Sequence, residues 1–551
     1  MLIGRVGSND FDGEISHEMQ FFRHKGISGM IETKRILTVS IFLLTIIMLG
    51  LPGIRVEAQT AEALSAEDYF KRISGNPNFK TSPKGESFCW HAAAGMHTFV
   101  EMYEATHDTV WLDYGIKYYD FLVEKLDTGP DGYKGWIGPY MYDKQYWCDV
   151  HVGDAILFRG ILEFAALALA DDVLKVKYGS KAHSYADLAA KHCIEKWDAR
   201  GTWHRDGNAG AYVSYTKFLA PGDLSEWRFG AEVKGSNLSL PFNKQNDMAQ
   251  VCMLLHRISG RDFYLERAEM IFFRMKRQFQ YFNNHYVWNY WEPFGQWDID
   301  RENNKPRHWV GVHPYRNYQA GEIGQIVDAY HNGIVFDRKD IERIINTNLN
   351  VMWNGDTENP EFSNSNISHI PKKKLTSGSG YSSLAGTLWT GLLGFSSTAQ
   401  ELYALRFRTE VSPSPAQLYF ENVISKTPAG FSRKYSDVKL SLPYTALTES
   451  QYLNMAVVMP QTIAKASETL IVSKAWAGSG TLEVDLYSQD GATKICALDS
   501  RHIEGGGDGL AGIVIFPWDG SNPDSGRRLR GDYRIRWTFK DGYREFPVSI
   551  E

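Results

Sequence analysis

Residues 86–104, ESFCWHAAAGMHTFVEMYE, set the pattern that decides the fold of most of this chain. Their apolar side chains recur mostly three and four positions apart, which predicts an amphipathic helix. Residues 109–126 repeat the pattern with a stripe of aromatic residues and leucines. Similar spacing continues to about residue 408, in segments 150–170, 174–197, 244–259, 262–279, 318–332, 338–353 and 381–404.

Short polar turns join these predicted helices in pairs. Ala105-Thr106-His107-Asp108 precedes one aromatic-rich second helix, and Ser259-Gly260-Arg261 precedes another. Each hairpin must bury one face on its neighbours. Four hairpins and a ninth helix therefore predict a mainly α fold, an (α/α) toroid of helical hairpins. Long polar and aromatic segments interrupt the pairs, and we expect them to wall a groove because long loops in compact domains are usually functional: 128–147, 198–242, 283–316 and 355–380.

The pattern changes after residue 408. Ser412-Pro413-Ser414-Pro415 indicates a linker within a β-rich segment, 409–465. Short alternating segments between Gly, Asp and Asn turns then predict a small C-terminal β-sandwich at 466–551. The catalytic toroid is accordingly predicted at 80–408. Because this tail lacks a cluster of His, Tyr and Arg, a chain ending near Arg408 is expected to fold and keep its activity. The predicted strands are 481–487, 512–516, 533–538 and 545–550.

The N-terminal region has the features of a targeting segment. Residues 36–51 form the only long apolar run; Lys34 and Arg35 precede it and Val56-Glu57-Ala58 follows it. This order predicts a secretory signal peptide at 30–58, of bacterial type. The run is short for a membrane span, so no integral membrane segment is expected after its removal. Residues 1–29 are expected to be a mis-start extension. The expected location is secreted, periplasmic or on the cell surface.

Composition excludes some partners. Lys plus Arg number 59 against 65 Asp plus Glu, a net charge of -6, so no basic excess exists to neutralise a nucleic-acid backbone. The five cysteines form no CxxC pair, which argues against a zinc site of that kind and leaves one disulfide open. We expect no cofactor. Asp298 and Asp300 are a weak hint of calcium.

Two family resemblances accompany these patterns. The hairpin repeat and the aromatic loops, over about residues 80–405, resemble the toroid of secreted polysaccharide lyases and six-hairpin glycoside hydrolases. Asn283-Asn284-His285 is similar to the Asn-Asn-His of toroidal alginate lyases, although here it precedes a strand-like stretch. Trp518-Asp519-Gly520, Ser525-Gly526 and residues 531–535 resemble the immunoglobulin-like domain of flagellar-hook capping proteins. That resemblance implies an accessory module at 466–551.

β-Elimination on a uronic acid needs a group that binds the carboxylate, a base and an acid. The segment His313-Pro314-Tyr315-Arg316-Asn317-Tyr318 offers such groups at the start of a predicted helix. We predict His313, Tyr315, His151 and Asn246 as catalytic, the last two because they lie at the starts of other inner helices. Capped helix starts and packed structural histidines explain the same residues without catalysis. Candidates for substrate binding are Arg316, His204, Arg205, Arg307, His285, Tyr318 and Trp291.

These residues favour a secreted polysaccharide lyase that cleaves an anionic polysaccharide containing uronic acid. Ulvan, alginate, pectin and glycosaminoglycans all remain open as substrates. One alternative is a glycoside hydrolase on the same toroid, which would use two carboxylates. A second is a non-catalytic glycan-binding envelope protein. The candidate carboxylates for the hydrolase are Asp149, Asp154, Asp247 and Glu322.

Overall fold

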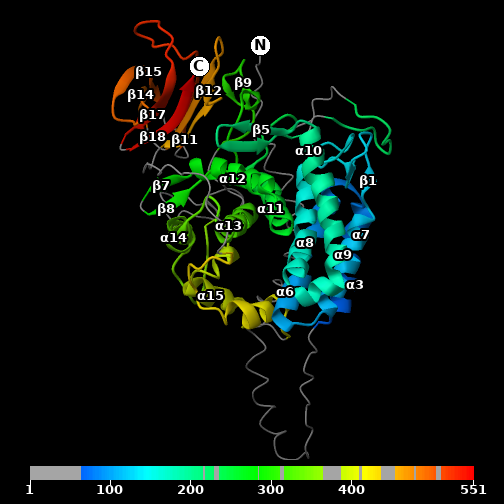
Figure 1. The fold of residues 1–551 in the computed structure, drawn as a ribbon. Coiled ribbons are helices and arrows are strands. Elements are labelled where there is room, and N and C mark those ends of the chain that lie inside the picture. Colours follow the sequence, from blue (N-terminus) through cyan, green and yellow to red (C-terminus); the bar gives the residue numbers. More distant parts are fainter. Residues whose placement is uncertain are drawn as a thin grey trace, which may run out of the picture.

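The computed structural model describes most of the chain from residue 64 onward. The described residues are 64–214, 217–228, 235–282, 284–310, 316–363, 386–408, 412–435, 453–476, 479–503, 510–540 and 542–551. The predicted signal peptide and mis-start extension lie outside them, as does much of the loop at 355–380. Helices form the first part of the molecule, and long strands at the C-terminal end pack beside it (Figure 1).

Two predicted hairpins are confirmed. α8 (His151–Ala170) packs against α9 (Asp172–Ala189), and α11 (Phe242–Ser259) packs against α12 (Asp262–Arg277). The Asp171 carboxylate caps α9 by accepting from the backbone N–H groups of residues 173 and 174. Gly260, with φ of 68°, ends α11 in the left-handed conformation that glycine adopts readily. These two short polar turns therefore set the helix boundaries, one through a capping carboxylate and the other through a left-handed glycine.

α8 and α11 are the inner helices of this region. Fifteen of the 20 residues of α8 are buried, and α8 packs against both α11 and α5 (Gly85–Ala93). α11 in turn packs against α13 (Arg316–His331). A helix that is apolar nearly all round must be enclosed by others. The other helices in the described part of this region include α3 (Ala66–Ser74), α4 (Asn78–Thr81), α6 (Thr98–Thr106), α7 (Val110–Val123), α10 (Lys196–Ala199), α14 (Arg338–Asn346) and α15 (Ser397–Ala404).

Several predicted helices are shorter than expected. The segment 86–104 is two helices, α5 and α6, because the backbone turns at Gly95. Gly95 has φ of 84°, and a Cβ there would lie 2.4 Å from the Tyr69 hydroxyl. In the described part of 381–404, the α-helix begins only at Ser397, after a 3-10 turn at Thr390–Leu392, and the Ser396 hydroxyl caps it by accepting from the Ala399 N–H. The ends of 174–197 and 338–353 contain π-helical turns, at Ala190–Glu195 and Thr347–Met352.

Small two-stranded sheets occupy the long loops of the helical region. They are all antiparallel, and each is a local hairpin rather than part of a central sheet. The pairs are β1 (Asp127–Thr128) with β2 (Lys134–Gly135), β3 (Gly138–Pro139) with β4 (Trp147–Cys148), β5 (Trp203–Asp206) with β6 (Ala209–Tyr212), β7 (Gln280–Phe282) with β8 (His285–Val287), and β9 (Ile299–Asp300) with β10 (Lys305–Pro306).

The C-terminal strands form two sheets with one common core. The first has the order β11-β13-β16 and the second β12-β18-β17-β14-β15. Neighbours are antiparallel except β12 and β18. Buried residues of both sheets, such as Leu470 and Trp537, belong to the same hydrophobic cluster. The strands are β11 (Leu453–Met459), β12 (Thr462–Ile463), β13 (Thr469–Trp476), β14 (Gly480–Ser488), β15 (Lys494–Ile503), β16 (Leu510–Trp518), β17 (Gly531–Phe539) and β18 (Gly542–Ile550).

The C-terminal core is not separate from the helical region. Trp291, Ile299 and Val310, all from the long loop before α13, are part of it. The Arg544 guanidinium reaches across and donates to the carbonyl oxygens of Arg277 and Phe279, at 2.8 and 3.1 Å. Shared burial and these hydrogen bonds join the two regions.

The expected linker at 412–415 is part of a folded segment. Ser414 caps a short helix, α16 (Pro415–Tyr419), by accepting from the backbone N–H of Gln417. The Tyr419 hydroxyl then donates to Glu104 at 3.1 Å. Leu418 and Phe431 pack against the helical core. All five cysteines, which lie in the described part of the chain, are buried free thiols.

The shared core leads us to revise the expectation that the tail is dispensable. A chain ending at Arg408 exposes Trp291, Ile299 and Val310, each worth about 1.5–3 kcal/mol when buried. We therefore expect it to unfold at a lower temperature than the full chain, or to aggregate. Thermal unfolding followed by circular dichroism compares the full chain with chains ending at residues 408 and 435. Equal unfolding midpoints for all three would contradict the shared core.

None of the helices in the described part of the chain has the length and apolar character that crossing a lipid bilayer requires.

Candidate functional site

A cavity of about 220 Å³ opens where α8 and α11 begin. Three of the four long loops that were expected to wall a groove contribute to its lining, 128–147, 198–242 and 283–316. We call it the helix-start cavity. Its polar and aromatic lining includes Glu86, Tyr140, Tyr142, Asp149, His151, Ser239, Lys244, Tyr290, Arg307 and His308.

A buried ion pair lies at one side of this cavity. Lys244 Nζ is 3.1 Å from Glu86 Oε1, and the Glu86 side chain is 2% exposed. Burial disfavours the charged form of Lys244, but Glu86 and nearby tyrosines more than offset it and hold the Lys244 pKa well above its ordinary value. Lys244 is therefore a fixed cation at neutral pH.

Tyrosines form the aromatic part of the lining. The rings of Tyr140 and Tyr142 meet edge to face with centroids 5.6 Å apart, and Tyr142 is 40% exposed at the surface. Tyr290 stacks on Tyr318 at 5.7 Å. Burial raises the pKa of Tyr140 well above its ordinary value. Tyr140 therefore keeps its proton at neutral pH, and it suits the role of hydrogen-bond donor or general acid.

His308 is a neutral imidazole in this setting. Its ring stacks on Trp291 at 5.2 Å, and its Nδ1 lies 3.2 Å from the Trp309 carbonyl oxygen. That contact assigns the ring proton to Nδ1 and leaves the lone pair on Nε2. Burial lowers the pKa of His308. A neutral imidazole can accept a proton near pH 7, which is what a general base must do.

Arg307 supplies a positive charge that no carboxylate of the described residues neutralises. Its Nη1 donates to the carbonyl oxygens of Trp297 and Asn237, at 2.8 and 3.0 Å. Carbonyl groups orient a guanidinium without cancelling its charge. An anionic ligand in the cavity would therefore be attracted to Arg307.

A buried charged network underlies the cavity beside His151. Lys196 Nζ is 2.7 Å from both Asp149 Oδ2 and Asp154 Oδ2, and Arg200 Nη1 is 2.8 Å from Asp149 Oδ2. Burial and the neighbouring Asp149 raise the pKa of Asp154 to about 7, against the opposing effect of Lys196. The cations and carboxylates are fully enclosed, so they stabilise one another and fix the start of α8.

His151 is held rigidly by this network. Its ring stacks on Trp197 at 3.6 Å, and its Nε2 is 2.9 Å from Thr202 Oγ1. Because the Thr202 hydroxyl donates to the Trp197 carbonyl, His151 Nε2 must be the donor to Thr202. Burial, with Lys196 and Arg200, lowers the His151 pKa well below its ordinary value. His151 is thus neutral, and its contacts suit positioning better than proton transfer.

Two of the other predicted site residues pack behind the lining of this cavity. Tyr318 contacts it through Tyr290, and Trp291 contacts it through His308. His313 and Tyr315 lie outside the described residues. Arg316 begins α13, with its side chain outside the description.

Asn246 and His285 lie elsewhere. The Asn246 amide is fully buried with Nδ2 3.2 Å from Met275 Sδ, between α11 and α12. Residues two apart on a helix point to different sides, so α11 can present Lys244 to the cavity only by turning Asn246 away. His285 is buried at the start of β8 and does not line the cavity.

Of the four carboxylates considered for hydrolysis, only Asp149 lines the helix-start cavity. Asp154 lies beneath it, bonded to Trp197 Nε1 at 2.7 Å. Asp247 accepts from Gln325 Nε2 at 2.7 Å, and burial raises its pKa to about 6. Glu322 accepts from Trp288 Nε1 at 2.8 Å. These three are contained in the packed interior.

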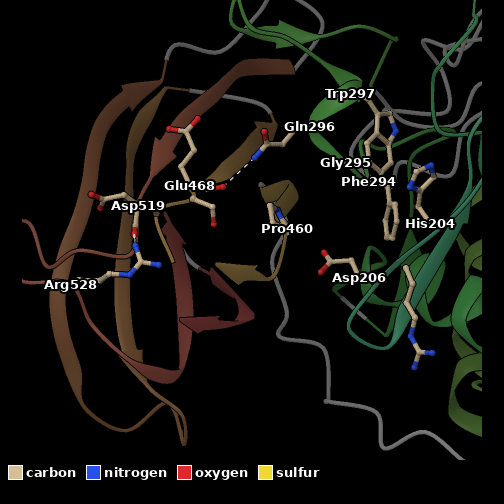
Figure 2. A pocket seen from close by; sticks show the side chains of 13 residues that line it. His204, Asp206, Phe294, Gly295, Gln296, Trp297, Pro460, Glu468, Asp519 and Arg528 are labelled. Carbon is tan, nitrogen blue, oxygen red and sulfur yellow. Dashed lines mark hydrogen bonds between the residues drawn. The ribbon is translucent and has the colours of Figure 1, made fainter. Parts of the chain in front are cut away.

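His204 and Arg205 line a different, larger cavity of about 930 Å³ between the helical region and the C-terminal sheets (Figure 2). The wall between the two cavities depends on Asp298. Its carboxylate accepts from the Ser239 N–H and hydroxyl, at 2.8 and 2.7 Å, and from the Phe294 N–H at 2.8 Å. These bonds give Asp298 a structural role.

Asp300, the other acid considered for calcium, caps a turn by bonding Asn303. Within the described ranges, no group of three or more His, Cys, Asp or Glu side chains could hold a metal ion.

Sequence reasoning did not single out Tyr140, Tyr290 or His308. Each lies in a loop that was expected to wall the groove, so their location was anticipated but their identity was not. A usable signal was the density of Tyr, His and Arg in the loop segments 140–146 and 286–309.

Comparison with known proteins gives little. No protein-family model matches the sequence, and no curated protein matches it. A search of solved structures found a glycoside hydrolase family 76 mannosidase from Bacteroides thetaiotaomicron, with 14% identity and a TM-score of 0.26. The match covers 44% of this chain and 52% of the mannosidase, about half its length. A TM-score this low does not establish a shared fold, so a functional assignment depends on the residues of this chain.

Replacing Asp298 with Asn tests the wall between the cavities. An amide keeps the size of the side chain but places an NH₂ group against donors, leaving buried N–H groups without acceptors. We expect the free energy of unfolding to fall by about 2–3 kcal/mol, measured by urea denaturation. Asp300→Asn, at an exposed turn, is the matched control and should change it little. Equal stability of the two variants would show that Asp298 does not organise the wall.

Proposed function

We propose that this protein is an exported polysaccharide lyase that cleaves a uronic-acid-containing polysaccharide by β-elimination at the helix-start cavity. The observation that carries the proposal is that this cavity combines a neutral His308, a protonated Tyr140 and the uncompensated charge of Arg307. We further propose that the helical hairpins close into an (α/α) toroid and that the C-terminal sheets are an accessory immunoglobulin-like β-sandwich.

In the proposed reaction Arg307 binds the uronate carboxylate and makes the neighbouring C5 proton more acidic. His308 Nε2 takes that proton, and the C5–H electron pair forms the C4–C5 double bond. The C4–O bond breaks, and the Tyr140 hydroxyl gives its proton to the leaving oxygen. A proton then passes through solvent from His308 to the Tyr140 phenolate, which restores both groups. Lys244 stabilises the phenolate while it exists, because its charge persists at neutral pH.

Three residues predicted from the sequence are close in the chain to a residue that packs against the cavity lining. His313, Tyr315 and Arg316 directly precede Tyr318, which stacks on a lining tyrosine. We propose that they contribute to substrate binding or proton transfer beside His308. His151 holds the start of α8 against the network of Lys196.

Hydrolysis is the alternative reading, and the lining argues against it. A hydrolase needs one protonated and one ionised carboxyl group beside the scissile bond. The two carboxylates that line the cavity, Glu86 and Asp149, each contact a cation, Lys244 in one case and Lys196 with Arg200 in the other. Both carboxylates are thus engaged in ion pairs that hold the protein together, which leaves the cavity without the pair of carboxyl groups that a hydrolase needs. A glycan-binding envelope protein is the third reading, and it would leave polymer length unchanged.

The proposal includes a place of action. Residues 30–58 would direct export, so the protein would meet its substrate outside the cytoplasm. The partner would be an anionic polysaccharide, with no nucleic acid, no cofactor and no integral membrane segment after the signal is removed.

Turnover of ulvan, alginate, pectin and glycosaminoglycans tests the reaction class. β-Elimination creates an unsaturated uronate that absorbs in the ultraviolet, whereas hydrolysis creates reducing ends without that absorbance. We expect His308→Gln and Tyr140→Phe each to lower the rate by about 100-fold or more with folding unchanged, the usual scale for an acid or base. His256→Gln is the matched control, because His256 also bonds a backbone carbonyl through Nδ1 but lies outside the cavity. New reducing ends without ultraviolet absorbance would contradict the lyase proposal and indicate a hydrolase.

The pH dependence of turnover gives an independent check. His308 acts as a base only when it is neutral, and burial lowers its pKa. Activity should therefore fall on acidification only below the ordinary imidazole pKa of about 6.5. In a profile of kcat/KM against pH, an acidic limb centred above that value would contradict His308 as the base.

A further inference from the structure

The cavity between the helical region and the C-terminal sheets is a second candidate ligand site. We call it the interface cavity, and its volume of about 930 Å³ lies within the range of about 300–1,000 Å³ typical of ligand sites. We propose that it binds an uncharged, hydroxyl-rich saccharide. This inference does not depend on the lyase reaction proposed for the helix-start cavity.

Two different walls enclose the interface cavity. In Figure 2, His204, Phe294 and Trp297 group on the side of the helical region, and Glu468 and Asp519 lie on the side of the C-terminal sheets. Sugars present both apolar C–H faces and hydroxyl groups. A site with an aromatic wall opposite a polar wall complements both at once.

The walls are held together without a ligand. The backbone N–H of Gln461 donates to both Asp206 carboxylate oxygens, at 3.0 and 3.1 Å. Gln296 Nε2 donates to the Glu468 carbonyl at 3.2 Å, and Arg301 pairs with the Glu468 carboxylate at 2.8 Å. A site that is already formed loses little free energy to ordering when it binds.

The aromatic wall is rigid and uncharged. Trp297 Nε1 donates to Ser239 Oγ at 3.1 Å, and the His204 ring lies 4.5 Å from the indole. Gly295 lies so close beneath that a Cβ there would be 2.3 Å from the Trp297 ring. Burial lowers the pKa of His204, which keeps its ring neutral near pH 7. A neutral aromatic surface suits the C–H face of a sugar.

The polar wall favours hydroxyl donors over anions. Three carboxylates, Asp206, Glu468 and Asp519, and two guanidinium groups line the cavity. Glu468 pairs with Arg301, and Arg205 pairs with Glu266, which leaves Asp206 and Asp519 against Arg528. Carboxylates accept from the hydroxyl groups of a sugar and repel a uronate.

The two arginines differ in their partners, because Arg205 contacts a carboxylate and Arg528 contacts carbonyl oxygens. Arg528 donates to the backbone carbonyl oxygens of Ala464 and Ile463, at 2.8 and 3.3 Å, and Arg205 pairs with Glu266 at 3.2 Å. Arg528 therefore keeps its charge, as Arg307 does in the helix-start cavity, but two carboxylates with no ion-pair partner among the described residues, Asp206 and Asp519, line the same cavity.

The two cavities share a wall. Ser239 lines the helix-start cavity and accepts from Trp297 Nε1 in the interface cavity. Arg307, in turn, donates to the Trp297 carbonyl. A polysaccharide with both charged and uncharged units could therefore place one kind in each cavity.

Isothermal titration calorimetry of the full chain with neutral cello-, xylo-, manno- and galacto-oligosaccharides tests the inference. We expect at least one of these neutral probes to bind. In a variant in which Lys244 and Arg307 are both replaced by Gln, we expect tetragalacturonate to bind no more tightly than the neutral probes. Glu468→Gln keeps the size of the side chain and should weaken neutral binding about tenfold. Trp297→Ala should weaken it at least tenfold. Glu483→Gln, an exposed residue on β14, is the control and should leave binding unchanged.

The outcomes separate this site from the proposed reaction. Absence of binding by all four neutral probes overturns the inference. It is also overturned if binding occurs but Glu468→Gln and Trp297→Ala leave it unchanged, because the saccharide then binds elsewhere. Circular dichroism verifies that both variants fold. If Trp297→Ala fails to fold, Glu468→Gln alone still tests the inference. Binding of a neutral probe, with no ultraviolet-absorbing products from any polysaccharide, would support the interface site and contradict the lyase proposal.

Discussion

The buried carboxylate of Asp298 is the constraint on which both cavities depend. It accepts from the backbone of Ser239, which leads into α11, and from the backbone of Phe294, which begins the wall of the interface cavity. The backbone N–H of Arg307 donates to the Asp298 carbonyl at 2.8 Å. Burial raises the pKa of Asp298, and the hydrogen bonds that it accepts oppose this shift. Asp298 thus connects the segments around Ser239 and Phe294 through its side chain, and the segment around Arg307 through its backbone carbonyl.

Buried charged groups also join separate segments elsewhere in the helical region. Lys196 is enclosed between two aspartates at the start of α8, and Lys276 contacts Asp340 at 2.6 Å between α12 and α14. Removing one partner of a buried ion pair leaves an uncompensated charge, which is strongly destabilising. Such pairs restrict how adjacent helices can be arranged. Their value is in specifying one arrangement, since apolar residues of the same volume can be equally stabilising.

Electrostatics separates the roles of the two cavities. The helix-start cavity contains the guanidinium of Arg307, which no carboxylate of the described residues pairs with, a phenol whose pKa is raised and an imidazole whose pKa is lowered. The interface cavity has more carboxylates than guanidinium groups and a neutral aromatic wall. The two are joined by the hydrogen bond between Ser239 and Trp297. The C-terminal sheets contribute to one cavity and, through Trp291 and Val310, to the packing behind the other.

Local patterns in the sequence by themselves determined the hairpins α8 to α9 and α11 to α12, four of the C-terminal strands, and the loops that wall the helix-start cavity. These features depend on neighbours within a few positions, which helical and strand periodicity reports directly. Tertiary structure alone decided that α11 presents Lys244 while Asn246 faces α12, and that Gly95 divides one predicted helix. It also decided that Trp291 belongs to the C-terminal core. Those choices depend on contacts between segments far apart in the chain, and no local spacing encodes them.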